Sequence, residues 1–261
     1  TDVINAAHTA GTKVIMTAVN FDKDDIRNII SNESVKEKFF LDTKNIIETY
    51  QLDGVNIDFE GLYQADRGSK INNFMTELTA FIHSQLPGKE VSFAGPAVNW
   101  GNYWDLDGLV QSCDMVFIMG YSFWGSWSST AGPCAPLTGF SNDITSVVTE
   151  DYGVPLSKYP EKLILGVPYY GHHWKTETGD AYSNVIEDGF ISSTRCYNDV
   201  ENAEIYGLQW DNISQTSWYS WQDGEQWHQS WFDDVQSLEK KYNLALANSL
   251  GGVGMWALGY D

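Results

Sequence analysis

The chain has 261 residues, of which 43% are hydrophobic, so it can bury a large core. Its formal net charge is −20, from 35 acidic and 15 basic side chains. A field of that sign repels phosphate backbones and anionic lipid, so nucleic acid and membrane surfaces are poor partners and a neutral ligand is favoured. No apolar run approaches the roughly 18 uncharged residues that a membrane span needs.

Short β-rich runs alternate with longer amphipathic stretches along most of the chain. The expected elements are helix 2–9, strand 13–20, helix 35–50, strand 54–60, helix 70–86, strands 90–97 and 115–121, helix 143–152, strand 163–171, helix 233–247 and strand 252–260. Strands that alternate with helices in this way predict a parallel sheet covered by helices. We expect one α/β domain over 1–261, a (β/α)8 TIM-type barrel. Six strands are found where such a barrel needs eight, so the first two are expected to be missing from this chain.

The segment 172–231 interrupts this alternation. It is rich in small polar and aromatic residues, and its stretch 219–229 predicts a hairpin that turns at Asp223-Gly224. We expect an elaborated loop between the last two strands, and long loops in compact domains tend to be functional.

The cysteines and histidines give no sign of a metal or cofactor site. Cys113, Cys134 and Cys196 allow at most one internal disulfide and lack metal-site spacing, which leaves their redox state open. Adjacent strand residues point to opposite faces, so His172 and His173 do not predict a two-histidine metal site, although one of them can line a ligand pocket. No glycine-rich phosphate loop is present, and we expect no cofactor.

The stretch 52–60, LDGVNIDFE, alternates polar and apolar side chains. Asn56, Asp58 and Glu60 share one face of the expected strand, and three apolar residues share the other. A solvated face is the ordinary explanation of such a pattern. Here helices flank the strand on both sides, so it should be central, and polar groups pointing into a barrel interior cost free energy unless they have partners. Glu60 also sits at the carboxyl end of the strand, where barrel enzymes keep their chemistry.

Asp58 and Glu60 lie two residues apart on that face, about 6.5–7 Å between Cα atoms. Two carboxylates that close in a partly dry site cannot both ionise freely, so one keeps a proton near neutral pH. A protonated carboxylic acid can donate to a leaving oxygen, which is what cleavage of a glycosidic bond requires. Glu60, at the barrel mouth, is the better candidate for this acid.

These residues resemble a known family. The stretch 53–60, DGVNIDFE, is similar to the D-G-x-D-x-D-x-E signature of glycoside hydrolase family 18, the chitinase-like enzymes. The stretch 119–122 is similar to the family's M-x-Y-D strand, 165–171 to its G-[IV]-P-[FY]-Y-G strand, and 251–261 to its last strand with a tryptophan. Four motifs in order, spread over essentially the whole chain, make the resemblance specific.

The resemblance implies a retaining mechanism in which the substrate supplies the nucleophile. Glu60 would protonate the leaving oxygen while the 2-acetamido oxygen of the sugar attacks its own anomeric carbon. Asp58 would orient that acetamido group, Tyr121 would hydrogen-bond to it, and Trp256 would form the floor under the distorted sugar. Such a mechanism needs no second carboxylate at the roughly 5 Å separation of ordinary retaining enzymes.

The sequence departs from the family pattern at two site positions. Asn56 replaces the first interior Asp, which removes a negative charge below Asp58, and Ser122 replaces the Asp that follows the Tyr. We expect reduced but retained function. The expected catalytic residues are Glu60, Asp58, Tyr121 and Asn56, and the expected substrate-binding residues are Trp256, Met119, Tyr169, Tyr170, Trp124 and Ser122. Phe123 and Trp127 are further candidates for sugar platforms, or for packing of their loop.

The resemblance therefore predicts a secreted or cell-surface glycosidase, expected as a monomer, that cleaves β-1,4 linkages in polymers of N-acetylglucosamine. Chitin or chitooligosaccharides are the first choice of substrate, because dense aromatic side chains suit a neutral polysaccharide. Peptidoglycan and N-glycan cores are alternatives within the enzyme class. A lectin-like chitin-binding protein without turnover is the alternative from another class.

Overall fold

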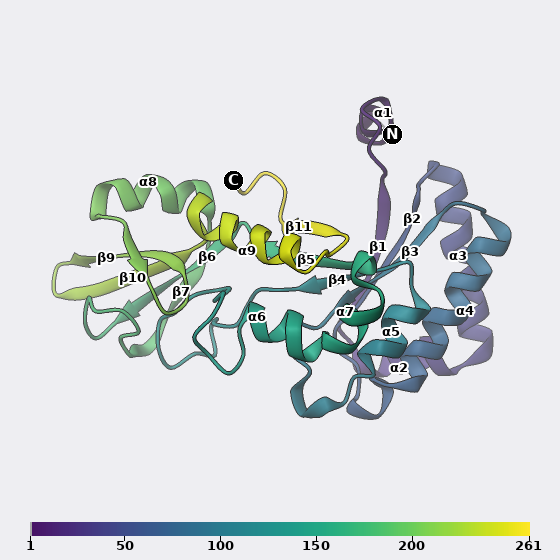
Figure 1. Ribbon diagram of the computed structural model, residues 1–261, viewed down its shortest axis with the longest axis horizontal. Coiled ribbons are helices and arrows are strands. Elements are labelled where there is room, and N and C mark those ends of the chain that lie inside the picture. Colours follow the sequence, from purple (N-terminus) through teal and green to yellow (C-terminus); the bar gives the residue numbers. More distant parts are fainter. Residues whose placement is uncertain (1) are drawn as a thin grey trace. The chain divides into compact units, whose positions relative to one another are not determined.

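The computed structural model describes residues 2–261, which divide into two units, each with strands and helices of its own (Figure 1). Unit 1 comprises the described residues up to Ile118 together with Ser157–Leu163, and unit 2 comprises Met119–Leu156 and Ile164–Asp261.

Parallel strands and covering helices make up unit 1. Its elements in chain order are α1 (Asp2–Thr9), β1 (Ile15–Asn20), α2 (Lys23–Ser31), α3 (Glu33–Tyr50), β2 (Gly54–Phe59), α4 (Ser69–Gln85), β3 (Glu90–Gly95), α5 (Leu106–Ser112) and β4 (Met115–Met119), whose last residue is counted in unit 2. Strand β1 pairs with β2, β2 with β3, and β3 with β4, all in parallel. Helices α3 and α4 lie beside these strands (Figure 1).

Apolar side chains on one face of β2 account for this packing. Val55, Ile57 and Phe59 are buried, and the Phe59 ring lies 6.1 Å from the rings of Phe39 on α3 and Phe74 on α4. The polar residues between them are not fully buried. The predicted alternation of strand 54–60 is therefore confirmed.

Two features of the helices differ from the sequence-based expectation. Helix α2 was not predicted, because four of its nine residues are charged, yet Asp22 caps it by accepting hydrogen bonds from the backbone N–H groups of Asp24 and Asp25. The expected helix 143–152 is α6 (Ile144–Ser146) followed by a π-helical turn, Val147–Asp151, and it begins at a capping box between Asp143 and Ser146.

Unit 2 holds one parallel strand pair and one antiparallel sheet. Its elements are α6, α7 (Gly153–Lys158, whose last residues belong to unit 1), β5 (Leu163–Pro168, whose first residue belongs to unit 1), β6 (Tyr170–Thr176), β7 (Val185–Arg195), α8 (Cys196–Tyr206), β8 (Gln209–Asp211), β9 (Thr216–Asp223), β10 (Gln226–Phe232), α9 (Val235–Ala247) and β11 (Gly252–Trp256). Strands β5 and β11 pair in parallel. All six predicted parallel strands are thus present.

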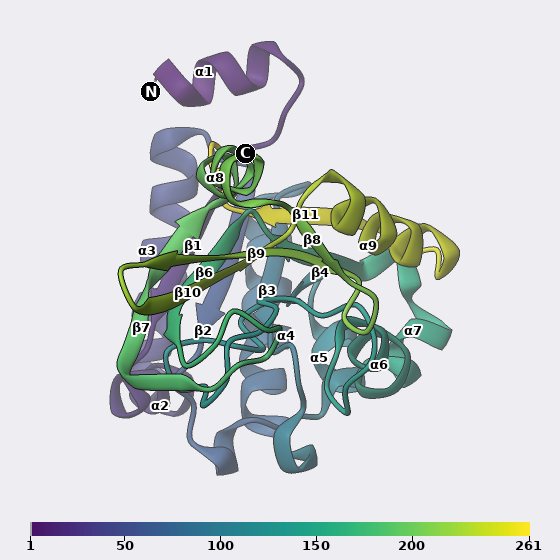
Figure 2. The same cartoon turned by 90° about the vertical axis from the view of Figure 1, so that its left-hand side faces the viewer.

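The segment expected as a loop, 172–231, is instead a five-stranded antiparallel sheet with a helix. The strand order is β7-β6-β10-β9-β8 (Figure 2), and α8 packs along one face of it. The hairpin at Asp223-Gly224 is confirmed, since Asp223 pairs with Gln226 and Gly224 has a φ of 60°. The expected single strand 163–171 is divided: β5 ends at Pro168, and β6 begins at Tyr170 in the other sheet.

Much of the aromatic content is core. Trp174, Trp218 and Trp231 are buried together on one face of the antiparallel sheet, whereas Tyr219 and Phe232 pack with Ala203 of α8 on the other. Among residues 2–261, the helices are all too short or too polar to cross a bilayer.

Candidate active site

The carboxylates of the β2 motif lie where its alternation predicts. Asp58 is half-buried within the strand, and Glu60 follows the last strand residue at its carboxyl end. The backbone N–H of Glu60 donates to the carbonyl of Asn20 at the end of β1, at 3.1 Å, which fixes the chain at this point. Gly61 then passes the Phe21 carbonyl so closely that a Cβ would lie 2.0 Å from that oxygen, so only glycine fits there.

Both carboxyl groups favour protonation. Burial raises the pKa of Asp58, and among residues 2–261 its Oδ1 atom has no hydrogen-bond partner. Partial burial, and then the negative charge of Asp58, raise the pKa of Glu60. A carboxyl group that keeps its proton above the ordinary range can act as a general acid.

Asn56 lies one layer deeper on the same face. Its Oδ1 accepts a hydrogen bond of 2.9 Å from Ser92 Oγ on β3, and the two residues are direct register partners. The amide is thereby held in place by a neighbouring strand.

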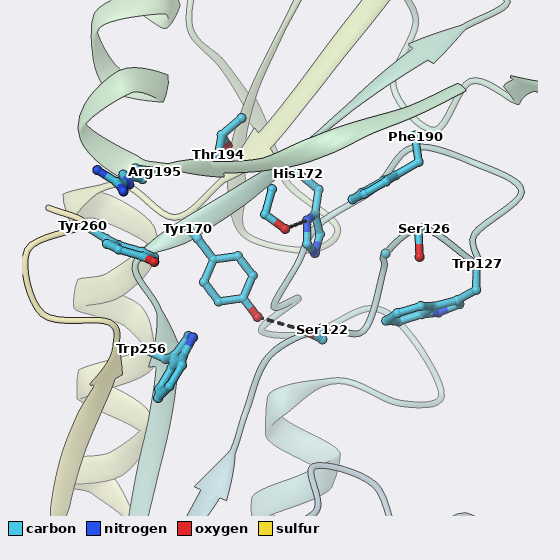
Figure 3. A pocket seen from close by; sticks show the side chains of 12 residues that line it. Ser122, Ser126, Trp127, Tyr170, His172, Phe190, Thr194, Arg195, Trp256 and Tyr260 are labelled. Carbon is cyan, nitrogen blue, oxygen red and sulfur yellow. Dashed lines mark hydrogen bonds between the residues drawn. The ribbon is translucent and has the colours of Figure 1, made fainter. Parts of the chain in front are cut away.

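Unit 2 contains a pocket of about 510 Å³ (Figure 3). Its lining residues are Ser122, Gly125, Ser126, Trp127, Tyr170, His172, Phe190, Ser193, Thr194, Arg195, Trp256 and Tyr260. Trp256 and Tyr260 lie on one side, and Phe190 and Trp127 on the other (Figure 3). Trp127 and Trp256 are 69% and 56% exposed, so both ring surfaces are available to a ligand.

Polar contacts shape the centre of this pocket. The hydroxyl groups of Ser122 and Tyr170 lie 2.8 Å apart (Figure 3), and the Tyr121 ring stands edge-on to that of Tyr170 with centroids 6.0 Å apart. Ser122 adopts a left-handed φ of 60°, and its N–H donates to Cys134 Sγ at 3.4 Å. This turn directly follows β4 and directs the serine hydroxyl toward Tyr170.

His172 contributes a buried imidazole to the same pocket. Ser193 Oγ lies 3.2 Å from its Nδ1, and these residues are register partners across β6 and β7. Its Nε2 is buried and has no hydrogen-bond partner among residues 2–261. Burial lowers the pKa of His172 to about 4, so the ring is neutral near neutral pH.

Three expected substrate-binding residues lie outside the lining of this pocket. Tyr169 packs against the α9 side of unit 2, with its hydroxyl 2.8 Å from that of Tyr242. Trp124 packs edge-on against Phe140, with ring centroids 4.8 Å apart, and lies partly buried against the tryptophan cluster of the sheet. Met119 ends β4, and its carbonyl accepts the N–H of Tyr121.

Sequence reasoning missed Phe190, Arg195 and Tyr260 as pocket residues, and it identified His172 only as one of two adjacent candidates. Register explains the omission: Arg195 on β7 lies opposite Tyr170 on β6, a pairing that no local pattern predicts. A weak signal existed, since Arg195 is one of only three arginines in the chain.

No group of three or more metal-ligating side chains is assembled among residues 2–261. His172 faces the pocket, whereas His173 lies on the other face of β6 with its Nε2 2.9 Å from His228 Nδ1. The three cysteines are buried and unpaired in the described chain.

Comparison with known proteins identifies the family. The model of glycosyl hydrolases family 18 matches residues 4–261. The chain belongs to this family. Membership places it among the glycosidases and agrees with the resemblance carried by the β2 motif.

Individual relatives agree with this assignment. The chain is 26% identical over 252 residues to YdhD of Bacillus subtilis, named a sporulation-specific glycosylase, and the match covers 93% of this chain and 56% of YdhD. It is 25% identical over 278 residues to human di-N-acetylchitobiase, covering 96% of this chain and 68% of that enzyme. The chain thus spans little more than half the length of YdhD.

A solved structure shows the fold. The GH18 chitinase from Cycas revoluta, in complex with (GlcNAc)3, superposes with a TM-score of 0.83 at 20% identity, covering 97% of this chain and 78% of that one. This likeness confirms the predicted TIM-type α/β fold class.

Proposed function

We propose that this protein hydrolyses β-1,4 linkages in N-acetylglucosamine polymers, with chitin or chitooligosaccharides as substrates. The observation that carries the proposal is the carboxylate pair of β2: burial raises the pKa of both Asp58 and Glu60, and the negative charge of Asp58 raises the pKa of Glu60 further. Family membership supports it. So do the relatives, one named a di-N-acetylchitobiase and one solved with an N-acetylglucosamine trimer.

The mechanism we propose is retaining and substrate-assisted. Glu60 donates its proton to the leaving oxygen, and the 2-acetamido oxygen of the same sugar forms a bond to the anomeric carbon as the glycosidic bond breaks. Water then opens the resulting oxazolinium ion, and Glu60 takes up a proton from that water.

Asp58 has the role of orienting the acetamido group and stabilising its positive charge. Its Oδ1 has no hydrogen-bond partner among residues 2–261, so it can accept the acetamido N–H. Asn56, held by Ser92, supports Asp58 from below. Tyr121 is proposed to hydrogen-bond to the acetamido group, and the exposed ring of Trp256 to carry the sugar.

The proposal takes residues 1–261 as a single catalytic domain of the TIM-barrel type. Polymers of this kind lie outside cells, so the protein is proposed to be secreted or at the cell surface, and to act as a monomer.

A turnover assay on chitooligosaccharides tests the assigned acid. Glu60→Gln should lower kcat about 10²–10⁴-fold, the usual contribution of one positioned general acid. Glu225→Gln is a matched control that removes the same charge from the exposed β9–β10 turn, and it should retain wild-type turnover.

Equal product from Glu60→Gln and wild type would eliminate Glu60 as the acid. Tight binding of chitooligosaccharides by wild type without any product would instead favour the lectin-like alternative. Release of product with inverted anomeric configuration, read by NMR, would contradict the substrate-assisted mechanism.

A further inference from the structure

The unit 2 pocket carries a positive charge within a strongly acidic chain. Arg195, the last residue of β7, lines the pocket, and none of the twelve lining residues is Asp or Glu. The whole chain has a net charge of −20. The pocket therefore presents a cation and no acidic lining residue, although the chain as a whole is acidic.

Arg195 is held in place without an acidic partner. Its Nη1 donates to the Tyr197 hydroxyl at 3.0 Å, and its guanidinium lies 5.0 Å above the centre of the Tyr260 ring. Among residues 2–261 it forms no salt bridge, whereas Arg27 pairs with Asp66 at 2.7 Å. Stacking on a ring fixes the plane of a guanidinium and leaves its N–H edges free for an oxygen ligand.

The pocket offers further groups suited to a sugar. The exposed ring of Trp256 lies on the same side of the pocket as Arg195 and Tyr260 (Figure 3). His172 lines the same pocket with only 5% of its surface exposed, and its buried Nε2 has no hydrogen-bond partner of good geometry among residues 2–261, so a ligand hydroxyl or amide can pair with it. A ring platform, a neutral imidazole and a cation thus occupy one cavity.

We propose that this pocket binds an N-acetylated sugar that carries a carboxylate, with Arg195 pairing with the carboxylate and Trp256 supporting the sugar ring. The inference rests on the proposed function and narrows its substrate from a neutral polymer to an acidic glycan, such as one with 3-O-lactyl groups on alternate amino sugars. The overall negative field opposes such a ligand at long range. That field is screened by salt beyond about 8–10 Å, whereas the hydrogen-bonded contact between guanidinium and carboxylate acts at short range.

The test compares two forms of one substrate. An oligosaccharide of alternating N-acetylglucosamine and N-acetylmuramic acid with free carboxylates is set against the same oligosaccharide with its carboxylates converted to methylamides. For wild type, kcat/KM should be about tenfold higher on the carboxylate form, the usual effect of a hydrogen bond to a charged group. Arg195→Gln should reduce that preference to about one.

Lys175→Gln is the matched control. It makes the same change in net charge, and Lys175 lies on β6 outside the pocket lining, so it should keep the wild-type preference. Arg195→Lys keeps the charge but lacks the planar fork, so its preference should be intermediate. Added salt should lower the wild-type preference.

Several outcomes overturn the inference. If Arg195→Gln lowers kcat/KM equally on both substrate forms, Arg195 serves only to hold Tyr260. If Arg195→Gln keeps the wild-type preference, as Lys175→Gln is expected to do, the charge of Arg195 does not contribute to recognition of the carboxylate. If circular dichroism shows Arg195→Gln unfolded, the preference of wild type and its salt dependence decide.

The experiment distinguishes failure of this inference from failure of the proposed function. A wild type that cleaves chitooligosaccharides but prefers the methylamide form overturns only the inference about the carboxylate. A wild type that cleaves none of the three substrates contradicts the proposed function itself.

Discussion

At Glu60, the position at the end of the strand and the charge of a neighbouring carboxylate both raise the pKa of the side chain. The period of two in β2 sends Val55, Ile57 and Phe59 into the core and leaves Asp58 and Glu60 on the other face. Partial burial and the charge of Asp58 then raise the pKa of Glu60. The ionised form of Glu60 therefore lowers the free energy of unfolding, and raised pKa values of this kind are common at functional sites.

Glu60→Gln should reveal this cost as a pH-dependent gain in stability. Because the folded-state pKa is raised above the ordinary value of 4.5, the folded state binds more protons, and the stabilisation from this group is present below that value and lost as pH rises through the folded pKa. The variant does not titrate there. Urea denaturation should show a larger gain in unfolding free energy for Glu60→Gln over wild type at about pH 7 than at about pH 4.

A gain that is equal at the two pH values, or larger at the lower one, would contradict the raised pKa of Glu60. Asp58→Asn should show the same sign, since burial raises the pKa of Asp58 as well.

At the scale of elements, the parallel strands were predictable and the antiparallel sheet was not. Strands such as β5, LILGVP, are dense in buried apolar residues that any strand pattern detects. Strand β7 is largely exposed, and β6 continues the chain of β5 with only Tyr169 between them. The strand that pairs with β6, β10, lies far along the sequence, so the antiparallel sheet is defined only by tertiary pairing.

Helix α9 depends on a buried ion pair. Lys241 on α9 contacts Asp233 at the end of β10, and both side chains are fully buried. Lys241→Met should lower the unfolding free energy by about 3–5 kcal/mol, because it leaves the Asp233 carboxylate buried without its cation. The double variant Asp233→Leu with Lys241→Met should lose less than the single variant, measured by urea denaturation.

Lys240→Met provides the control for this helix. Lys240 is half-buried, and its ammonium lies 5.9 Å from the centre of the Trp210 ring, a contact worth at most about 1 kcal/mol. A double variant as unstable as Lys241→Met would show that the pair acts through packing and not through charge.

At the scale of the whole molecule, the sequence predicted the carboxylate strand β2 more completely than the pocket. The carboxylates of β2 follow from a local alternation, and the Ser122 and Tyr170 positions follow from motifs. Arg195, Phe190 and Tyr260 meet in one pocket only because β7 pairs with β6 and the chain end returns beside them. Of the many tryptophans, composition could not distinguish the buried ring of Trp174 from the exposed ring of Trp256.

Alkylation of the three cysteines measures whether the core among residues 2–261 is closed to solvent. Cys113, Cys134 and Cys196 are all buried and unpaired in residues 2–261, and burial raises the pKa of Cys113 and Cys134 to about 12. Thiolate is the reactive form, so the folded protein should resist alkylation by iodoacetamide at neutral pH. In guanidinium chloride, without any reductant, all three should be alkylated, as counted by intact mass. Rapid labelling of a thiol in the folded protein would show that its core opens readily, and fewer than three adducts after unfolding would show that a disulfide had formed.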